Sequence, residues 1–252
     1  MKIIVNFVKR YSYIFVAIAL IALYEIATEN NWLSNILFPT IERMAELFPQ
    51  YGQELLTNVL SSFGLLIPSL IWAAVLGIGL GIPMGLRKGL HHTLNPIFNA
   101  ISPLPATLLT PYAIHISGSF RSASIFIIAF GSFWPIFNAT MNGVMTIDKR
   151  YLDNAATLAV TPLRKMLHII LPAAAPSIFS GSITAMRISF ILLVVAEMYG
   201  VSSGMGYFVQ RYSTMGSFDQ VAIGFIVLSI ALVAFLAIFD VIKKRVLHWT
   251  LN

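Results

Sequence analysis

The chain has 252 residues, of which 58% are hydrophobic and 10% are charged, and its formal net charge is +6. Soluble domains carry about 25% charged residues, so this composition excludes an ordinary soluble enzyme and indicates an integral membrane protein. The basic balance does not indicate nucleic-acid binding, because most Lys and Arg residues lie in short segments between apolar runs, and the lack of cysteine excludes disulfides and thiolate metal sites.

Six apolar runs approach the length of about 20 residues that a membrane-spanning helix needs. They are 13–27, 63–86, 94–116, 122–144, 177–199 and 221–242. The first follows a basic start and has no small-residue cleavage site after it, so we expect a retained helix rather than a signal peptide. The sequence therefore predicts an all-α, polytopic membrane protein with six transmembrane helices in a single domain, residues 1–252.

Two of these runs carry a further local signal. In the second run, Gly77, Gly81 and Gly85 recur at every fourth position, and such a stripe lets two membrane helices approach closely. An internal packing face is the preferred interpretation, and a seam between two copies of the chain is the alternative. The third run contains four prolines, so we expect it to lie in the protein interior or beside a cavity, where neighbours or water satisfy the freed carbonyl groups.

The basic residues divide unequally between the two sides of this arrangement. One side holds Lys2, Lys9, Arg10, Arg87, Lys88, Lys149, Arg150, Arg164, Lys165, Lys243, Lys244 and Arg245, and the other holds Arg43, Arg121 and Arg211. Cytoplasmic loops are enriched in Lys and Arg, so both termini and the segment 148–176 are predicted to be cytoplasmic. The segment 28–57 is then external, and within it 40–48 is expected to form a short amphipathic helix at the outer surface.

The segment 148–176 is a polar interruption that is typical of two short cytosolic helices. We predict a first helix over 150–160, with Asp153 near its N-terminus, where the helix dipole favours negative charge. Thr161 is placed to cap a second helix, and Pro162 falls in the first turn of that helix, which tolerates proline.

The second helix is expected to end at Leu171-Pro172, because the residue before a proline avoids helical backbone angles. On the first helix, Ala155, Leu158 and Ala159 are expected to share one small apolar face. A face of that kind fits a groove on a partner protein.

The spacing of this segment resembles the EAA loop of ABC importer permeases: Glu-Ala-Ala, three residues, Gly, nine residues, Ile, one residue, Leu-Pro. Ala155, Ile169, Leu171 and Pro172 match, while Asp153 stands in place of Glu, Asn154 in place of Ala, and Ala159 in place of Gly. Three further stretches resemble the sulfonate, nitrate and taurine permease branch: Gly81-Ile82-Pro83-Met84-Gly85, Pro103-Leu104-Pro105, and Ala196-Glu197-Met198 followed by Gly204-Met205-Gly206-Tyr207. The similarity covers about residues 36–250.

The resemblance implies a permease subunit of an ABC importer in the bacterial inner membrane, with a cytosolic coupling-helix loop that docks on an ATPase. The implied coupling residues are Asp153, Ala155, Ala159, Leu171 and Pro172. The implied partners are a second, identical permease subunit, two cytosolic ATPase subunits, an extracytoplasmic solute-binding protein and membrane lipid, with no nucleic acid. The implied cargo is a small anion such as a sulfonate, taurine or nitrate, and the alternative is a pyrimidine vitamin precursor.

The chain itself is not expected to be an enzyme or to hold a cofactor or metal. It has no Gly-x4-Gly-Lys-Ser/Thr phosphate loop, so ATP and Mg²⁺ are expected to bind to the partner ATPase. An ion-coupled secondary transporter is the less favoured alternative, because such proteins usually show an internal repeat and paired intramembrane acids, and neither is visible.

The fifth apolar run places a charge inside the membrane. Ser180, Thr184 and Arg187 follow helical spacing and form one polar face, which either lines the translocation path or holds Arg187 against carbonyl groups for structure alone. Glu197 is expected at the outer end, either at a gate or hydrogen-bonded to the loop that follows. The residues assigned to the path are Ser180, Thr184, Arg187, Glu197, Pro103 and Pro105.

Overall fold

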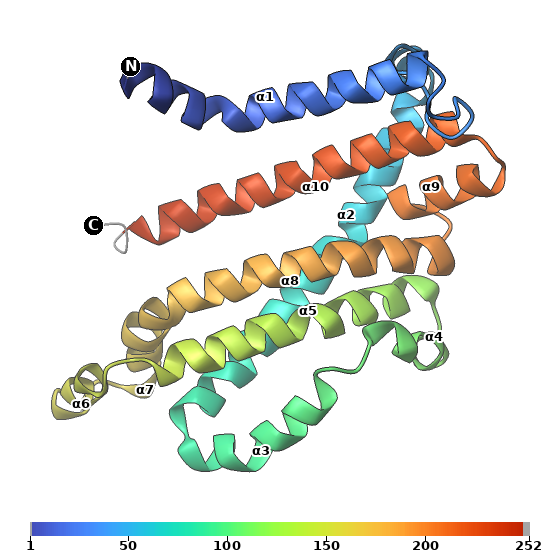
Figure 1. Cartoon of the computed structure of the whole chain (residues 1–252). Coiled ribbons are helices and arrows are strands. Elements are labelled where there is room, and N and C mark those ends of the chain that lie inside the picture. Colours follow the sequence, from blue (N-terminus) through green and yellow to red (C-terminus); the bar gives the residue numbers. More distant parts are fainter. Residues whose placement is uncertain (1, 249–252) are drawn as a thin grey trace. The chain divides into compact units, whose positions relative to one another are not determined.

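The computed structural model of the chain describes residues 2–248, with side chains described from residue 15 onward. Every regular element within this range is a helix, which confirms the predicted all-α fold. In chain order the elements are α1 (Lys2–Glu29), α2 (Ile41–Leu86), α3 (Lys88–Ile101), η1 (Ala106–Leu109), α4 (Thr110–Ser117), α5 (Phe120–Met145), α6 (Lys149–Thr157), α7 (Pro162–Lys165), η2 (Met166–Ile170), α8 (Leu171–Gly200), α9 (Met205–Thr214) and α10 (Phe218–Val246) (Figure 1).

Four continuous helical stretches in the described part of the chain are long and apolar enough to cross a membrane: Ile41–Leu86, Phe120–Met145, Pro162–Gly200 and Phe218–Val246. They contain the second, fourth, fifth and sixth predicted runs. The first predicted run lies within α1, whose side chains are described only from residue 15.

The third predicted run, 94–116, was expected to be the least regular, and it is divided among α3, η1 and α4 rather than forming one continuous helix. The helical backbone stops after α3, a turn carries Pro103 and Pro105, and the chain resumes helical geometry in η1 and α4. Proline lacks a backbone N–H and disfavours helical angles in the residue before it, so two prolines separated by one residue interrupt the helix. Pro111, by contrast, falls in the first turn of α4, which accepts it.

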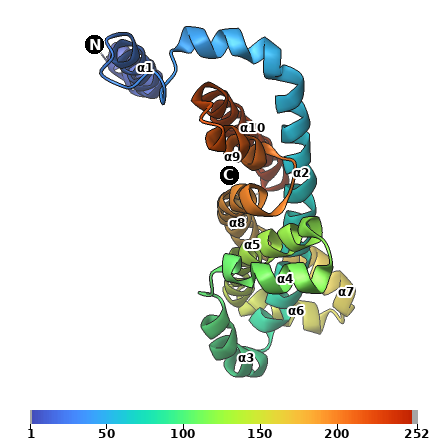
Figure 2. The ribbon, with the colours of Figure 1, turned by 90° about the vertical axis from the view of Figure 1, so that its right-hand side faces the viewer.

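The described residues form two compact units. One consists of the residues up to Leu56 together with Phe208–Val227, and the other consists of Thr57–Tyr207 together with the residues from Leu228 onward. In the larger unit α5 and α8 run side by side, and they are seen nearly end-on in the turned view (Figures 1 and 2). Both views place α6 and α7 next to each other at the end of this pair.

The glycine stripe of α2 packs against α5. A methyl group built at Gly81 would lie 2.7 Å from Cβ of Thr140, and one at Gly85 would lie 2.6 Å from Cβ of Val144. Such separations are shorter than real carbon contacts, so no side chain fits there without movement. The predicted internal packing face is therefore confirmed. Because lipid tails are as apolar as leucine, this close fit, rather than removal of surface from water, is what holds two membrane helices together.

An aromatic cluster joins α2, α3 and α5. Trp134, Phe137 and Met141 are buried there with Met84 of α2, and Phe98 of α3 packs edge-on to Phe137 with ring centres 5.1 Å apart. Edge-to-face pairs of this kind contribute about 1 kcal/mol beyond their buried area. The cluster therefore holds α3 on the α2–α5 pair although the third run is broken.

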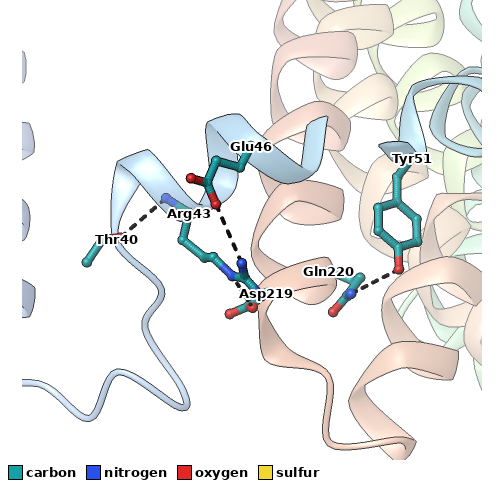
Figure 3. Close-up of polar contacts among 6 residues, drawn as sticks. All are labelled: Thr40, Arg43, Glu46, Tyr51, Asp219 and Gln220. Atoms are coloured by element: carbon teal, nitrogen blue, oxygen red, sulfur yellow. Dashed lines mark hydrogen bonds and ion pairs between the residues drawn. The ribbon is translucent and has the colours of Figure 1, made fainter. Parts of the chain in front are cut away.

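In the smaller unit, polar contacts join the beginning of α2 to the beginning of α10 (Figure 3). Arg43 bridges Asp219, with Nε 3.2 Å from Oδ2, and Glu46, with Nη1 3.5 Å from Oε2. Gln220 donates a hydrogen bond to the Tyr51 hydroxyl over 3.1 Å. The expected separate short helix over 40–48 was wrong, because these residues begin the long helix α2. Thr40 caps that helix, since its hydroxyl accepts from the Arg43 N–H over 3.3 Å.

Candidate functional site: the arm of α6, α7 and η2 and the turn after α8

The arm formed by α6, α7 and η2 begins with a capped helix. The carboxylate of Asp148 accepts a hydrogen bond from the Arg150 N–H over 2.9 Å, and this satisfies one of the free donors of the first turn of α6. The helix covers Lys149–Thr157, so it begins one residue earlier and ends three residues earlier than the predicted 150–160.

A tight turn at Ala159 ends α6. Ala159 has a left-handed backbone with φ of 48°, the Ala159 N–H donates to the Ala156 carbonyl over 3.1 Å, and the Val160 N–H donates to the Ala155 carbonyl over 3.0 Å. These two bonds are the pattern of a Schellman motif, which usually places glycine in the left-handed position. The chain therefore makes the glycine-type turn with alanine, at a cost of about 1–2 kcal/mol.

The second half of the arm differs from the prediction in two ways. Pro162 does occupy the first turn of α7, but the Thr161 side chain makes no capping bond, and the Thr161 carbonyl instead accepts from the Lys165 N–H over 2.9 Å. Nor does Leu171-Pro172 end the helix, since the helical run continues without a break from Pro162 to Gly200. A π-helical turn, η2, precedes Pro172, and the wider turn accommodates a nitrogen that cannot donate.

The expected apolar face of α6 is divided between the interior and the surface. Ala155 is 2% exposed, whereas Leu158 is 75% exposed, and Asp153 and Ala159 are also on the surface. The prediction that Ala155 shares a partner-facing surface with Leu158 and Ala159 was therefore wrong for Ala155. It failed because α6 is anchored: Leu152 packs against the buried cluster of Ile82, Val144, Ile170, Ala174 and Ile178, and this orientation turns Ala155 inward.

Large apolar side chains remain on the outside of the arm. Tyr151, Leu158, Leu163 and Leu167 are each at least half exposed. The arm also holds itself together, because Lys165 donates a hydrogen bond from Nζ to the Leu152 carbonyl over 3.3 Å. The result is a folded projection on which apolar side chains are exposed among charged ones such as Arg150 and Arg164, and it is joined directly to a membrane-spanning helix.

The polar residues of α8 lie on one exposed side of that helix. Ser180, Thr184 and Arg187 are all exposed, while Ala185, Ser189 and Leu193 on the opposite side are buried. No carboxylate in the described part of the chain lies within ion-pair distance of Arg187. The structure therefore brings these three predicted path residues together. Pro103 and Pro105 are exposed in the turn between α3 and η1.

Glu197, near the C-terminal end of α8, is fully buried. Its Oε2 accepts a hydrogen bond from the Gly206 N–H over 2.7 Å. Of the two roles considered for this residue, the geometry matches the one in which it binds the following loop. Gly204 has φ of 115°, and a methyl group there would collide with the Glu197 carboxylate, so the motif needs glycine at this position.

Two side chains of α2 fix the same loop from the other side. Asn58 Oδ1 accepts from the Gly204 N–H over 2.9 Å, and Ser62 Oγ accepts from the Met205 N–H over 2.9 Å. Sequence reasoning missed both residues, because neither carries a local signal and they lie more than 140 positions before their partners. The signals that pointed to this turn were Glu197, which was expected to bind the loop that follows or to lie at a gate, and the Gly204-Met205-Gly206 motif.

The site has no features of a metal centre. The residues that the structure describes contain no group of three or more His, Asp or Glu side chains able to hold a metal ion. The functional features are thus an arm with exposed apolar side chains, a polar helix face and a hydrogen-bonded turn after α8.

The sequence of the chain is similar to those of known transport proteins. The family model of the binding-protein-dependent transport system inner membrane component matches residues 54–250. The aliphatic sulfonates transport permease protein SsuC of Escherichia coli (strain K12) is 30% identical over 223 residues, which cover 84% of this chain and 81% of SsuC. The nitrate import permease protein NrtB of Leptolyngbya laminosa is 30% identical over 173 residues, covering 66% of this chain and 62% of NrtB.

A solved structure has the same fold. An inward-facing conformation of the MetNI methionine ABC transporter includes a chain that aligns with a TM-score of 0.66 and 19% identity, covering 78% of this chain and 98% of that chain. At this level of identity the likeness concerns the fold alone.

Proposed function

This chain belongs to the family of inner membrane components of binding-protein-dependent transport systems, the multi-pass permeases of ABC importers, and we propose that its cargo is a small oxyanion. The observation that carries the cargo proposal is the exposed Arg187 on the polar face of α8, with no carboxylate to balance its charge in the described structure. A charge inside a membrane span is costly unless it serves a path or a partner. The similarity to a sulfonate permease and a nitrate permease supports the same class of cargo.

The proposed assembly has two copies of this chain, two cytosolic ATPase subunits and an extracytoplasmic solute-binding protein. ATP and Mg²⁺ bind to the ATPases, and this chain performs no chemical step. Both termini and the arm face the cytoplasm, because the cytoplasmic side is the one that accumulates Lys and Arg. Residues 1–252 act as one permease domain.

The proposed coupling mechanism follows from the unbroken helical run Pro162–Gly200. An ATPase that holds the exposed apolar side chains of the arm applies its force to α7, and the force passes through η2 into α8. Arg187 and its polar neighbours lie on the same helix, so movement of the arm changes how they face the path. The coupling surface is proposed to comprise Asp153, Leu158 and Ala159, with Ala155, Leu171 and Pro172 holding the arm in place.

Co-purification and transport test this function. The chain is expressed with ABC ATPases and solute-binding proteins from the same genome, reconstituted in proteoliposomes, and supplied with methanesulfonate, taurine, nitrate or a pyrimidine. We expect a stable complex with the ATPase and ATP-dependent uptake of one of the oxyanions. Uptake of the pyrimidine alone would overturn the cargo proposal, and uptake driven by an ion gradient without ATPase would overturn the coupling proposal.

Cysteine labelling tests the orientation, because the natural chain has no cysteine. Single cysteines replace Glu46, Ser203, Lys88 and Lys165 in turn. A thiol reagent that cannot cross the membrane is expected to reach positions 46 and 203 from outside, and positions 88 and 165 only after the membrane is opened. The opposite pattern would show that the topology is inverted.

A further inference from the structure

A polar pocket opens beside the outer turn of α8. It has a volume of about 540 Å³ and is lined by Ser61, Arg121, Tyr199, Gly200, Ser202 and Ser203 together with a few apolar side chains. All of these residues belong to the larger unit. Small-molecule sites have volumes of about 300–1,000 Å³, so the pocket is large enough for a small organic or inorganic ion.

Arg121 gives the pocket its charge. The residue lies in the first turn of α5, and its Nη2 donates a hydrogen bond to the Gly64 carbonyl over 3.3 Å, which holds the guanidinium in place. No Asp or Glu lines the pocket, and no described carboxylate lies within ion-pair distance of Arg121. The guanidinium therefore has donors left for an anion.

The other two arginines predicted to lie outside are balanced by acids. Arg43 pairs with Asp219 and Glu46, and Arg211 Nη1 lies 3.5 Å from Glu54 Oε1. Arg121 thus differs from both in lacking an acidic neighbour within the described structure. An arginine in a pocket without a carboxylate favours a negatively charged ligand, because its charge is otherwise uncompensated.

Hydroxyl-bearing residues line the pocket beside Arg121, and Leu65, Phe120 and Val201 form its apolar part. The Oγ atoms of Ser61 and Ser203 are 2.7 Å apart, and Ser202 and Tyr199 contribute two more hydroxyls. A hydroxyl can turn its hydrogen toward an oxyanion, and a guanidinium can bind two of the anion's oxygens at once. This combination suits a sulfonate, nitrate, bicarbonate or phosphate group better than a cation or a neutral ring.

The wall of the pocket is fixed before any ligand arrives. Gly204, which directly follows the two serines, is held by Asn58, and Gly206, two residues further on, is held by Glu197. A loop that is already fixed lowers the entropic cost of binding, because the hydrogen-bond donors do not have to be ordered when the ligand binds. The buried Glu197 therefore has a positioning role for Ser202 and Ser203.

We propose that this pocket is an outer oxyanion-binding site, in which Arg121 and the hydroxyls of Ser61, Ser202 and Ser203 hold the anionic group of the cargo. The proposal rests on the proposed oxyanion cargo for its biological meaning. The pocket lies at the Gly200 end of α8, the helix that also carries Arg187.

Paired reagents of opposite charge test the site in the full chain reconstituted in phosphatidylcholine vesicles. Ser202 is replaced by cysteine, and its reaction rates with an anionic sulfonatoethyl thiosulfonate and a cationic trimethylammonioethyl thiosulfonate are compared. With Arg121 present, we expect the ratio of anionic to cationic rate to be about tenfold higher than with Arg121→Gln, the scale of one charge interaction at a protein surface. Arg121→Lys should retain part of the preference.

Two controls make the result specific. Ser34→Cys, an exposed position in the other unit, should show the same rate ratio with and without Arg121. Sodium methanesulfonate, compared with sodium chloride at equal ionic strength, should slow labelling at position 202 only when Arg121 is present. If Ser202→Cys fails to fold, Ser61→Cys reports on the same pocket. A rate ratio at either position that does not depend on Arg121 would overturn the proposal.

A lipid phosphate is the other possible source of the same chemistry, and vesicle composition separates the two. If labelling slows with added phosphatidylglycerol but not with methanesulfonate, the pocket binds a lipid headgroup and the cargo assignment is wrong. Transport by the full complex is measured independently. If the complex imports an oxyanion equally well with Arg121→Gln, the site is refuted but the proposed function is not. If the chain binds methanesulfonate but does not assemble with an ATPase, the proposed function is refuted but the site is not.

Discussion

The carboxylate of Glu197 and the backbone N–H of Gly206 lie 2.7 Å apart, and this hydrogen bond joins the outer end of α8 to the beginning of α9. The carboxylate is fully buried, and Gly204 packs against it from the intervening turn. Burying a polar group is costly unless it forms a hydrogen bond, so the Glu197 carboxylate needs the Gly206 N–H as a donor and Gly204 as a residue small enough to pack against it. The spacing of the Glu197…Gly204-Met205-Gly206 motif follows from this contact.

The first prediction concerns the size and acceptor capacity of that side chain. Glu197→Gln keeps an oxygen that accepts from Gly206 and should preserve the fold. Glu197→Ala leaves the Gly206 N–H buried without a partner and should cost about 1–3 kcal/mol. Thermal unfolding in detergent measures the difference, with Glu46→Ala as a surface control that should change little. An unaltered midpoint for Glu197→Ala would show that the contact contributes nothing.

The second prediction concerns the contact between α2 and α5. Gly81→Ala introduces a methyl group 2.7 Å from Cβ of Thr140 and should destabilise the protein by about 1–3 kcal/mol through overpacking. Gly79→Ala, on the same helix, meets nothing within 4 Å and is the matched control, expected to be neutral or slightly stabilising. Equal unfolding midpoints for the two variants would contradict the packing argument.

The third prediction concerns the left-handed turn of the cytosolic arm. Ala159→Gly removes the steric penalty at φ of 48° and should stabilise the arm by about 1 kcal/mol. Ala159→Val adds a branched side chain at a position that disfavours it and should destabilise the arm. Limited proteolysis of the 148–176 segment measures both effects locally. Faster cleavage of the glycine variant than of the natural chain would count against the assigned backbone.

The fourth prediction separates the surface of the arm from its anchor. Leu158→Glu places a charge on a side chain that is 75% exposed, so the chain should fold normally but lose ATPase binding and stimulation. Ala155→Glu forces a charge into a buried position and should disrupt the arm itself. Co-purification with the ATPase and thermal unfolding, measured on the same samples, distinguish the two. If a folded Leu158→Glu variant still binds the ATPase and stimulates it normally, the docking surface does not include Leu158.

The fifth prediction concerns the polar face of α8. Arg187→Ala should leave the complex assembled but reduce transport at least tenfold, because alanine cannot stabilise an anion in the path. Ser182→Ala is the control on the same helix, since the Ser182 hydroxyl is already bonded to the Ile178 carbonyl over 2.9 Å. If Arg187→Ala aggregates while Ser182→Ala folds, the arginine has a structural role and the path assignment is wrong.

The sequence by itself determined the helical class, the positions of most of the long apolar helices and the existence of two short helices between the fourth and fifth apolar runs. Apolar runs near 20 residues have only one stable form in lipid, the helix, because it satisfies its own backbone groups. The Gly77, Gly81 and Gly85 stripe likewise predicted a close helix contact from spacing alone. Local sequence did not predict the backbone at Pro172. A proline was expected to end the helix there, but the π-helical turn before it lets the helix continue.

Only the tertiary structure decided which residues meet across long stretches of chain. Ala155 faces inward because Leu152 anchors α6 on the larger unit's core. Asn58 and Ser62 bind the turn after α8 because α2 passes beside that turn. Arg121 shares a pocket with Ser202 and Ser203 because the beginning of α5 lies beside the same turn. Helical periodicity predicts which side of a helix is polar. Which element that side contacts depends on helix packing, because packing is set by contacts between residues far apart in the chain.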